Sequence, residues 1–198
     1  MIYAVLTGEL HVGKTTICRA LVHLAQQRGC SVRGILTSPI LDPAGQRLGF
    51  ALLDLATAEQ RELARVDRDY GGPGVGPFHF DPAVLQWGHD LVARALAEGC
   101  DLLVVDEIGR LELEQGTGFS SLLDVLAANA GSCRAARAAG GHGLLVMRKA
   151  LLAAFRRRLP QLEFVTFEVT RDNRDTLSAR IAEWLSGDSQ GGVAPVRA

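Results

Sequence analysis

The most constraining feature of the sequence is a glycine-rich segment that directly follows an apolar run. Residues 8–16 read G-E-L-H-V-G-K-T-T, and residues 2–6 before them read I-Y-A-V-L. The segment matches G-x-x-x-x-G-K-[ST] at every fixed position, and it has a predicted strand before it and a predicted helix after it. Glycines let the backbone fold tightly, with its N–H groups pointing inward. The pattern therefore predicts a strand, a turn that holds a polyphosphate, and a helix.

The side chains of this segment also suit a di- or triphosphate. Lys14 supplies a positive charge for the β and γ phosphates, and Thr15 supplies a hydroxyl for Mg²⁺. The helix that begins here adds the positive end of its dipole. The predicted nucleotide-binding segment is Gly8, Glu9, Leu10, His11, Val12, Gly13, Lys14, Thr15 and Thr16.

A second candidate feature lies near the middle of the chain. Residues 102–107 read L-L-V-V-D-E, four apolar residues followed by two carboxylates. Such a run alone also fits a strand that ends in solvated acids. Next to a phosphate loop, however, a carboxylate at the end of a strand is placed to hold Mg²⁺. We assign Asp106 to the metal and Glu107 to the water that attacks the γ phosphate.

Apolar periodicity divides the remaining chain into alternating strands and helices. The predicted strands, by residue number, are 2–6, 30–36, 48–55, 101–105, 144–147 and 163–169. Helical stripes of apolar residues run through 17–25, 84–96, 119–126, 151–159 and 177–185. Asp81 and Pro82 open the second helix, and residues 35–55 are predicted to form a β-hairpin around a turn at 42–45. This order predicts an α/β fold with a mostly parallel sheet and helices on both faces.

Length and composition limit the remaining possibilities. The 198 residues suggest one domain over 1–185, followed by a disordered tail at 186–198 that lacks apolar periodicity. The net charge of −1 gives no electrostatic argument for nucleic acid or an anionic membrane. The chain has no apolar run long enough to span a bilayer and no leader sequence, so we expect a cytoplasmic location. Residues 131–143, rich in Gly, Ala and Arg, are predicted to be a mobile connection.

Several segments resemble one known family. Residues 106–113, D-E-I-G-R-L-E-L, are similar to the D-E-I-G-K-M-E-L segment of the THEP1 family of nucleoside triphosphatases. Residues 34–50 are similar to its G-F-x-T … G-x-R-x-G-F hairpin. Residues 75–80 and 168–174 resemble its V-G-x-Y-x-V and E-V-T-x-x-N-R segments, and the order of all these segments over 1–185 agrees. The chain departs from the pattern at Arg110, Leu111 and Phe78, where Lys, Met and Tyr are usual.

The resemblance implies a small RecA-like P-loop NTPase fold. It also implies Mg²⁺-dependent hydrolysis of nucleoside triphosphates (ATP, GTP and, with broad base tolerance, CTP and UTP) to diphosphate and phosphate. The residues that match the family's functional positions are Gly8, Gly13, Lys14, Thr15, Asp106 and Glu107.

Three further residues are weaker candidates. Arg47, on the predicted hairpin, is expected to reach a phosphate and act in catalysis, or else to pair with a nearby carboxylate. Asn173 and Arg174 open the last helix and are expected to meet the nucleotide base, although a role of Asp172 or Asn173 as a plain helix cap fits equally well.

Two other functions stay open from the sequence. One is a small-molecule or nucleotide kinase, in which a bound acceptor replaces water. The other is a nucleotide-gated binding or assembly module with slow turnover, and the sequence does not name a protein partner for it.

Overall fold

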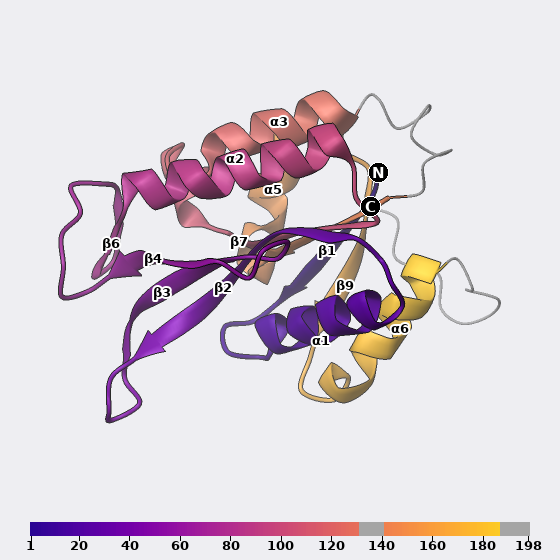
Figure 1. Cartoon of the computed structure of the whole chain (residues 1–198), viewed down its shortest axis with the longest axis horizontal. Helices are drawn as coiled ribbons and strands as arrows, with labels where there is room; N and C mark the ends of the chain where they lie inside the picture. Colours follow the sequence, from indigo (N-terminus) through magenta and orange to yellow (C-terminus); the bar gives the residue numbers. More distant parts are fainter. Residues whose placement is uncertain (131–140, 187–198) are drawn as a thin grey trace.

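The structure is a computed structural model that describes residues 1–130 and 141–186, except for the side chains of Glu107 and Ala130. Strands of these residues form one nine-stranded sheet with helices on both faces (Figure 1). The strands are β1 (Ile2–Gly8), β2 (Val32–Leu41), β3 (Arg47–Asp54), β4 (Gln60–Arg65), β5 (Gly74–Val75), β6 (Phe78–Phe80), β7 (Leu102–Ile108), β8 (His142–Met147) and β9 (Phe164–Val169). The helical elements are α1 (Lys14–Gln27), α2 (Pro82–Glu98), η1 (Leu111–Gln115), α3 (Ser120–Ala130), η2 (Lys149–Leu151), α5 (Leu152–Arg158) and α6 (Arg174–Ser186).

The central part of the sheet consists of parallel strands in the order β2-β7-β8-β1-β9. Strand β8 therefore lies between β1, which leads into the glycine-rich segment, and β7, which carries the acidic pair. Since the strands are parallel, their carboxyl ends meet at one edge, where ligands of such sheets bind. The predicted α/β fold is confirmed, with a mostly parallel centre and helices on both faces.

The predicted hairpin at 35–55 is also confirmed, because β2 and β3 pair antiparallel from Ile35 and Asp54 outward. The antiparallel region is nevertheless larger than predicted: β4, β6 and β5 continue it beyond β3. Periodicity does not detect β4, because it reads Q-R-E-L-A-R and carries only two buried residues. Strands β5 and β6 have two and three residues, too few for periodicity to detect.

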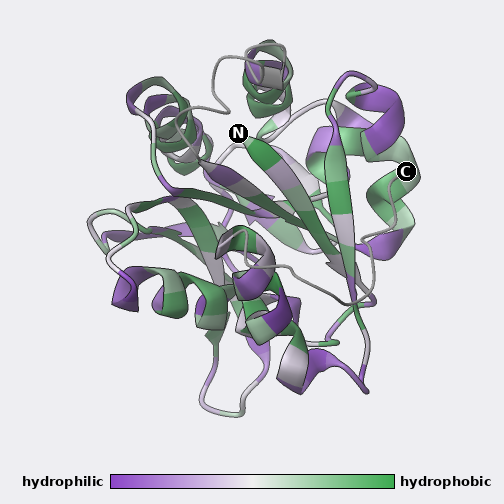
Figure 2. Ribbon diagram, turned by 90° about the vertical axis from the view of Figure 1, so that its right-hand side faces the viewer, coloured by the Kyte–Doolittle hydropathy of each residue, from purple (hydrophilic) through white to green (hydrophobic). Residues whose placement is uncertain are grey.

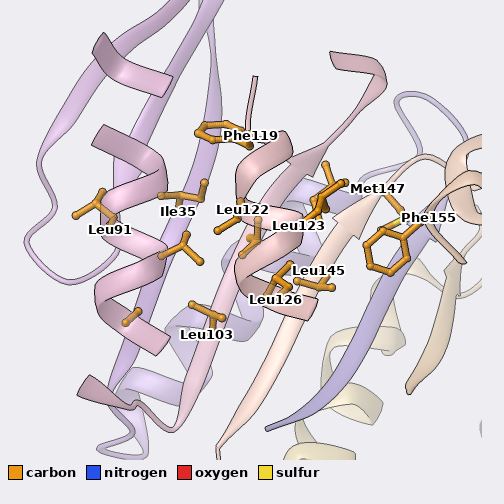
Figure 3. Close-up of a cluster of buried hydrophobic side chains, with 14 of the residues drawn as sticks. Ile35, Leu91, Leu103, Phe119, Leu122, Leu123, Leu126, Leu145, Met147 and Phe155 are labelled. Atoms are coloured by element: carbon orange, nitrogen blue, oxygen red, sulfur yellow. The ribbon is translucent and has the colours of Figure 1, made fainter. Parts of the chain in front are cut away.

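Side chains on the central strands alternate between two hydrophobic clusters, one on each face of the sheet. In β1, Tyr3 and Val5 join one cluster, whereas Ala4 and Leu6 join the other. The first cluster lies under α2, α3 and α5, and Figure 3 shows Leu122 and Leu126 above the sheet within it. The second lies under α1 and α6. Apolar colour accordingly follows the central strands, and polar colour gathers on loops and outward helical turns (Figure 2).

The ends of the helices follow the sequence closely. Asp81 caps α2, because its carboxylate accepts a hydrogen bond from the Ala83 N–H at 2.8 Å, and Pro82 is the first helical residue, as predicted.

Within the described residues, no helix is both long enough and apolar enough to cross a membrane. Most of the 131–143 connection, and the tail from 187 onward, lie outside the described residues.

Candidate functional site

The glycine-rich segment forms a tight turn between β1 and α1 (Figure 1). Gly13 has a φ of +107°, and His11, with a φ of +60°, is one of two described residues other than glycine with a positive φ. A Cβ atom at Gly8 would lie 2.8 Å from the carbonyl oxygen of Val169 in the neighbouring strand. Strained backbone of this kind persists where the surrounding structure holds it, and it gathers at binding sites.

The N-terminus of α1 is open to a ligand. No described side chain caps it, and its first turn contains no acidic residue. The first turn can therefore donate backbone N–H bonds to an anion, which the positive end of the helix dipole also attracts. Lys14 spans the turn, and its ammonium donates to the carbonyl oxygens of Gly8 at 3.0 Å and Glu9 at 2.7 Å. This cation is thereby held over the turn that would receive a phosphate.

Asp106, near the end of β7, is the buried carboxylate of the site. It is 1% exposed, and its Oδ2 accepts hydrogen bonds from the Thr37 hydroxyl at 3.0 Å and the Thr37 N–H at 3.3 Å. The Thr15 hydroxyl donates to the same oxygen at 3.5 Å. Burial, and then the charge of Asp106, raise the pKa of the Cys18 thiol one turn further along α1.

The structure thus brings together two residues that are 91 positions apart, Thr15 and Asp106. Their side-chain oxygens are hard donors of the kind that Mg²⁺ prefers. Both are anchored, Thr15 at the start of a helix and Asp106 in a buried strand. The donor set therefore fits a magnesium ion beside the phosphate loop.

Glu107 lies next to Asp106 in β7, and its side chain is outside the described part of the chain. The backbone there is irregular, because the register between β7 and β8 shifts between Val105 and Ile108. Irregular pairing at the end of a strand is frequent next to active sites.

Arg47 is exposed at the start of β3, and its guanidinium packs over the Phe50 ring, 5.2 Å from the ring centroid. Arg47 pairs with Leu41 of β2, which is four residues beyond Thr37. Four residues of a strand span about 13 Å, so Arg47 lies about that far from Thr37, the hydrogen-bond partner of Asp106. Its predicted contact with a phosphate stays a prediction.

Asn173 is the last residue of the connection from β9 to α6, and Arg174 is the first residue of α6. This connection starts beside the phosphate loop, because Val169 pairs with Gly8. The Asn173 side chain accepts from the Thr170 N–H and donates to the Glu168 carbonyl oxygen, both at 2.9 Å. These two bonds join the end of the connection, at Asn173, to its start, at Glu168 and Thr170. The guanidinium of Arg174 lies 3.6 Å from its neighbour Asp175 and is exposed. The predicted contact of both residues with a base stays a prediction.

Two residues of the site carry no signal of their own in the sequence. Thr37 holds Asp106 from β2, 69 positions away. Glu112, 5% exposed, bridges the ends of the segment after β7: it accepts from the Gly109 N–H at 2.7 Å and the Phe119 N–H at 2.9 Å. The only sequence sign of either is its place inside a segment that resembles the family pattern.

Comparison with known proteins identifies the family of the chain. A family model described as NTPase matches residues 3–182. The chain is 31% identical to "Nucleoside-triphosphatase THEP1" of Methanopyrus kandleri over 91% of the chain and 96% of that protein. The corresponding protein of Methanosarcina barkeri is 32% identical, over 92% and 96%.

Solved structures share the fold. The crystal structure of THEP1 from Aquifex aeolicus superposes with a TM-score of 0.68 at 20% identity, covering 93% of this chain and 99% of that one. The solution structure of a human cancer-related nucleoside triphosphatase gives a TM-score of 0.64 at 24% identity, covering 96% and 100%. Since both the family model and relatives of matching length cover nearly the whole sequence, the chain belongs to the THEP1 family of NTPases.

Proposed function

We propose that this protein hydrolyses nucleoside triphosphates to diphosphate and phosphate in the presence of Mg²⁺. The observation that carries the proposal is the approach of the Thr15 hydroxyl to the Asp106 carboxylate, 3.5 Å apart, beside an uncapped helix N-terminus and Lys14. Membership of a family whose relatives are named nucleoside-triphosphatases supports the same reaction.

Each residue has a role that its position suits. The turn from Gly8 to Thr16 surrounds the β and γ phosphates with backbone N–H groups, and Lys14 moves its hydrogen bonds from the turn's carbonyl oxygens to phosphate oxygens. Thr15 and Asp106 would hold Mg²⁺, which when bound offsets the charge of the phosphates. Glu107 orients a water molecule in line with the γ phosphorus and accepts its proton, so that the diphosphate leaves with the electron pair of the broken bond.

The nucleotide preference and the cellular location are further predictions. A site that holds the phosphates through backbone and Lys14 reads little of the base, so we expect ATP, GTP, CTP and UTP all to be substrates. The cytoplasmic location expected from the sequence stays a prediction.

A phosphate-release panel tests the proposal. The full chain is incubated with ATP, GTP, CTP or UTP, each with Mg²⁺ and with the ion removed by a chelator. We expect phosphate release with more than one nucleotide, and loss of release when the ion is removed. No release from any nucleotide would refute hydrolysis.

Two further measurements separate hydrolysis from the two other functions considered from the sequence. With γ-labelled nucleotide and a pool of metabolites, a kinase transfers label to an acceptor, whereas a hydrolase releases it as phosphate. A nucleotide-gated module with slow turnover would bind nucleotide tightly and release phosphate slowly until a partner is added.

A further inference from the structure

Arg148 is the first residue after β8, the strand that separates the two halves of the site. Strand β8 pairs with β1, where Val146 is opposite Leu6, and with β7, where Met147 is opposite Ile108. Arg148 lies two residues beyond Val146 and Gly8 two residues beyond Leu6, so Arg148 is level with Gly8. It therefore emerges at the carboxyl edge of the sheet, between the phosphate loop on one side and the acidic pair on the other.

The direction of its side chain follows from the alternation of the strand. Leu144 and Val146 pack into the cluster under α1, and Leu145 and Met147 into the opposite one. Arg148 keeps an extended backbone, with φ −74° and ψ 146°. Since successive side chains of an extended chain point to opposite faces, Arg148 leaves the sheet on the face of α1. That is the face on which Thr15 meets Asp106.

Two other basic side chains near this edge are paired with carboxylates, whereas the guanidinium of Arg148 is not. Among the described residues, Lys149 pairs with Glu168 at 2.6 Å and Arg110 with Glu114 at 2.7 Å. Arg148 is exposed, and its guanidinium makes no ion pair, hydrogen bond or ring contact with a described residue; its carbonyl oxygen accepts a bond from the Leu151 N–H at 3.0 Å. A guanidinium keeps its charge at every relevant pH and presents a planar fork of donors that matches phosphate oxygens.

We propose that Arg148 is a catalytic residue that contacts the γ phosphate and stabilises the charge of the transition state. The inference rests on the proposed hydrolysis. As the bond from the γ phosphorus to the bridging oxygen breaks, the electron pair goes to the diphosphate, and a bond to the attacking water oxygen forms. The water proton goes to Glu107. Arg148 donates N–H bonds to the phosphate oxygens and transfers no proton, whereas Lys14 binds the same group before the reaction.

The test compares Arg148→Ala with the unaltered full chain, using Mg²⁺ and ATP. We expect kcat to fall about 10³-fold, because an arginine that stabilises the phosphoryl transition state contributes about that much or more. Affinity for a non-hydrolysable ATP analogue should change by less than about threefold, since the loss is confined to the transition state. Binding of ADP with aluminium fluoride, which resembles that state, should weaken about as much as kcat falls.

Two matched variants complete the experiment. Arg157→Ala removes the same charge from an exposed position in the last turn of α5, and kcat should stay within about twofold of the unaltered chain. Arg148→Lys keeps the charge without the fork, and it should regain only part of the rate.

The outcomes separate this assignment from the proposed function. If the unaltered chain hydrolyses ATP and Arg148→Ala keeps kcat within about threefold, the assignment is overturned and hydrolysis stands. Equal losses of analogue affinity and of kcat/KM, with kcat unchanged, would also overturn it, because Arg148 would then act in ground-state binding alone. No hydrolysis by the unaltered chain would remove the proposed function and this assignment together.

Discussion

At the scale of single residues, the site is organised around one oxygen of a buried carboxylate, Oδ2 of Asp106. Asp106 has its Oδ2 atom held by Thr37 and faced by Thr15, so its orientation is fixed before a metal arrives. A ligand that is oriented in advance binds its metal more tightly than one that must be ordered. Thr37, which holds Asp106, should therefore control metal affinity. Glu107, which lies beside Asp106 in the sequence, should control turnover.

Replacing Glu107 by Gln tests the assignment of the base. Glutamine keeps the size of the side chain but does not accept the proton of the attacking water. We expect phosphate release to fall at least about 10²-fold while ATP affinity stays within about threefold. The measurements are steady-state phosphate release and calorimetric binding of a non-hydrolysable analogue. Release at the unaltered rate would remove the assignment.

Replacing Thr37 by Val tests the support of Asp106. The change preserves shape but removes the hydroxyl that donates at 3.0 Å. Loss of such a supporting bond typically weakens metal affinity by about tenfold or more. We therefore expect the Mg²⁺ concentration for half-maximal hydrolysis to rise about tenfold, with kcat at saturating Mg²⁺ much less affected.

A suitable control for Thr37→Val is Thr166→Val in β9. Its hydroxyl is buried and has no hydrogen-bond partner in the described part of the structure. This control should leave the Mg²⁺ titration unchanged. An unshifted titration for both variants would show that Thr37 does not orient the metal ligand.

At the scale of elements, what can be predicted depends on how long and how apolar each segment is. Periodicity identifies β1 and β7 because both are buried on both faces and read as apolar runs. It does not identify β4 and the π-helical segment η1, since their sequences are mostly polar and their conformation is set by neighbours. The phosphate loop and Asp106 follow local patterns, whereas the Thr37 contact arises only when β2 pairs with β7.

The segment between β7 and α3 depends on the buried carboxylate of Glu112. Its two oxygens accept the Gly109 and Phe119 N–H groups and so close the segment around η1. In Glu112→Gln one of these oxygens becomes an NH₂ group that faces an N–H donor. Because bonds to a charged acceptor contribute about 1.5–3 kcal/mol, we expect the free energy of unfolding to fall by about 2 kcal/mol.

Urea denaturation of Glu112→Gln and of Glu114→Gln provides the measurement. Glu114 is exposed and pairs with Arg110 one turn away, so its substitution should cost less than about 0.5 kcal/mol. Equal stability of the two variants would mean that the Glu112 bridge contributes little.

Strand β2 approaches β7 through a glycine that has no room for a side chain. Gly34 has a φ of +108°, and a Cβ atom there would overlap the carbonyl oxygen of Val104. Gly34→Ala should therefore lower the free energy of unfolding by more than about 3 kcal/mol, because both backbone strain and overlap destabilise the fold.

Gly29→Ala isolates the contribution of strain alone. Gly29 also has a positive φ, +77°, but no atom lies within 4 Å of the position that a Cβ atom would take there. It should cost about 1–2 kcal/mol. If the two alanine variants unfold at the same urea concentration, the close approach of β2 to β7 does not require glycine at position 34.

At the scale of the whole molecule, the strand order explains why distant segments form one site. Strands β7 and β1 end at the same edge, and β2 passes this edge at Thr37, so Thr37, Asp106 and Thr15 meet although 69 and 91 positions separate the contacting pairs. The order itself does not follow from local patterns, because these fix strands but not which strands become neighbours. Only the resemblance to a family gives an expectation for the arrangement.

A ligand that binds at this edge should stabilise the molecule as a whole, since it contacts the ends of several central strands. At 100 times its Kd, a ligand specific for the folded state adds about 2.7 kcal/mol. For a chain of this length, that corresponds to a rise in Tm of roughly 5–10 °C. We expect ATP with Mg²⁺ to produce such a shift in a thermal melt, and Lys14→Ala to lose most of it. Lys14→Ala also removes two hydrogen bonds across the turn, so its Tm without nucleotide serves as its own baseline. An undiminished shift in Lys14→Ala would place the nucleotide elsewhere on the protein.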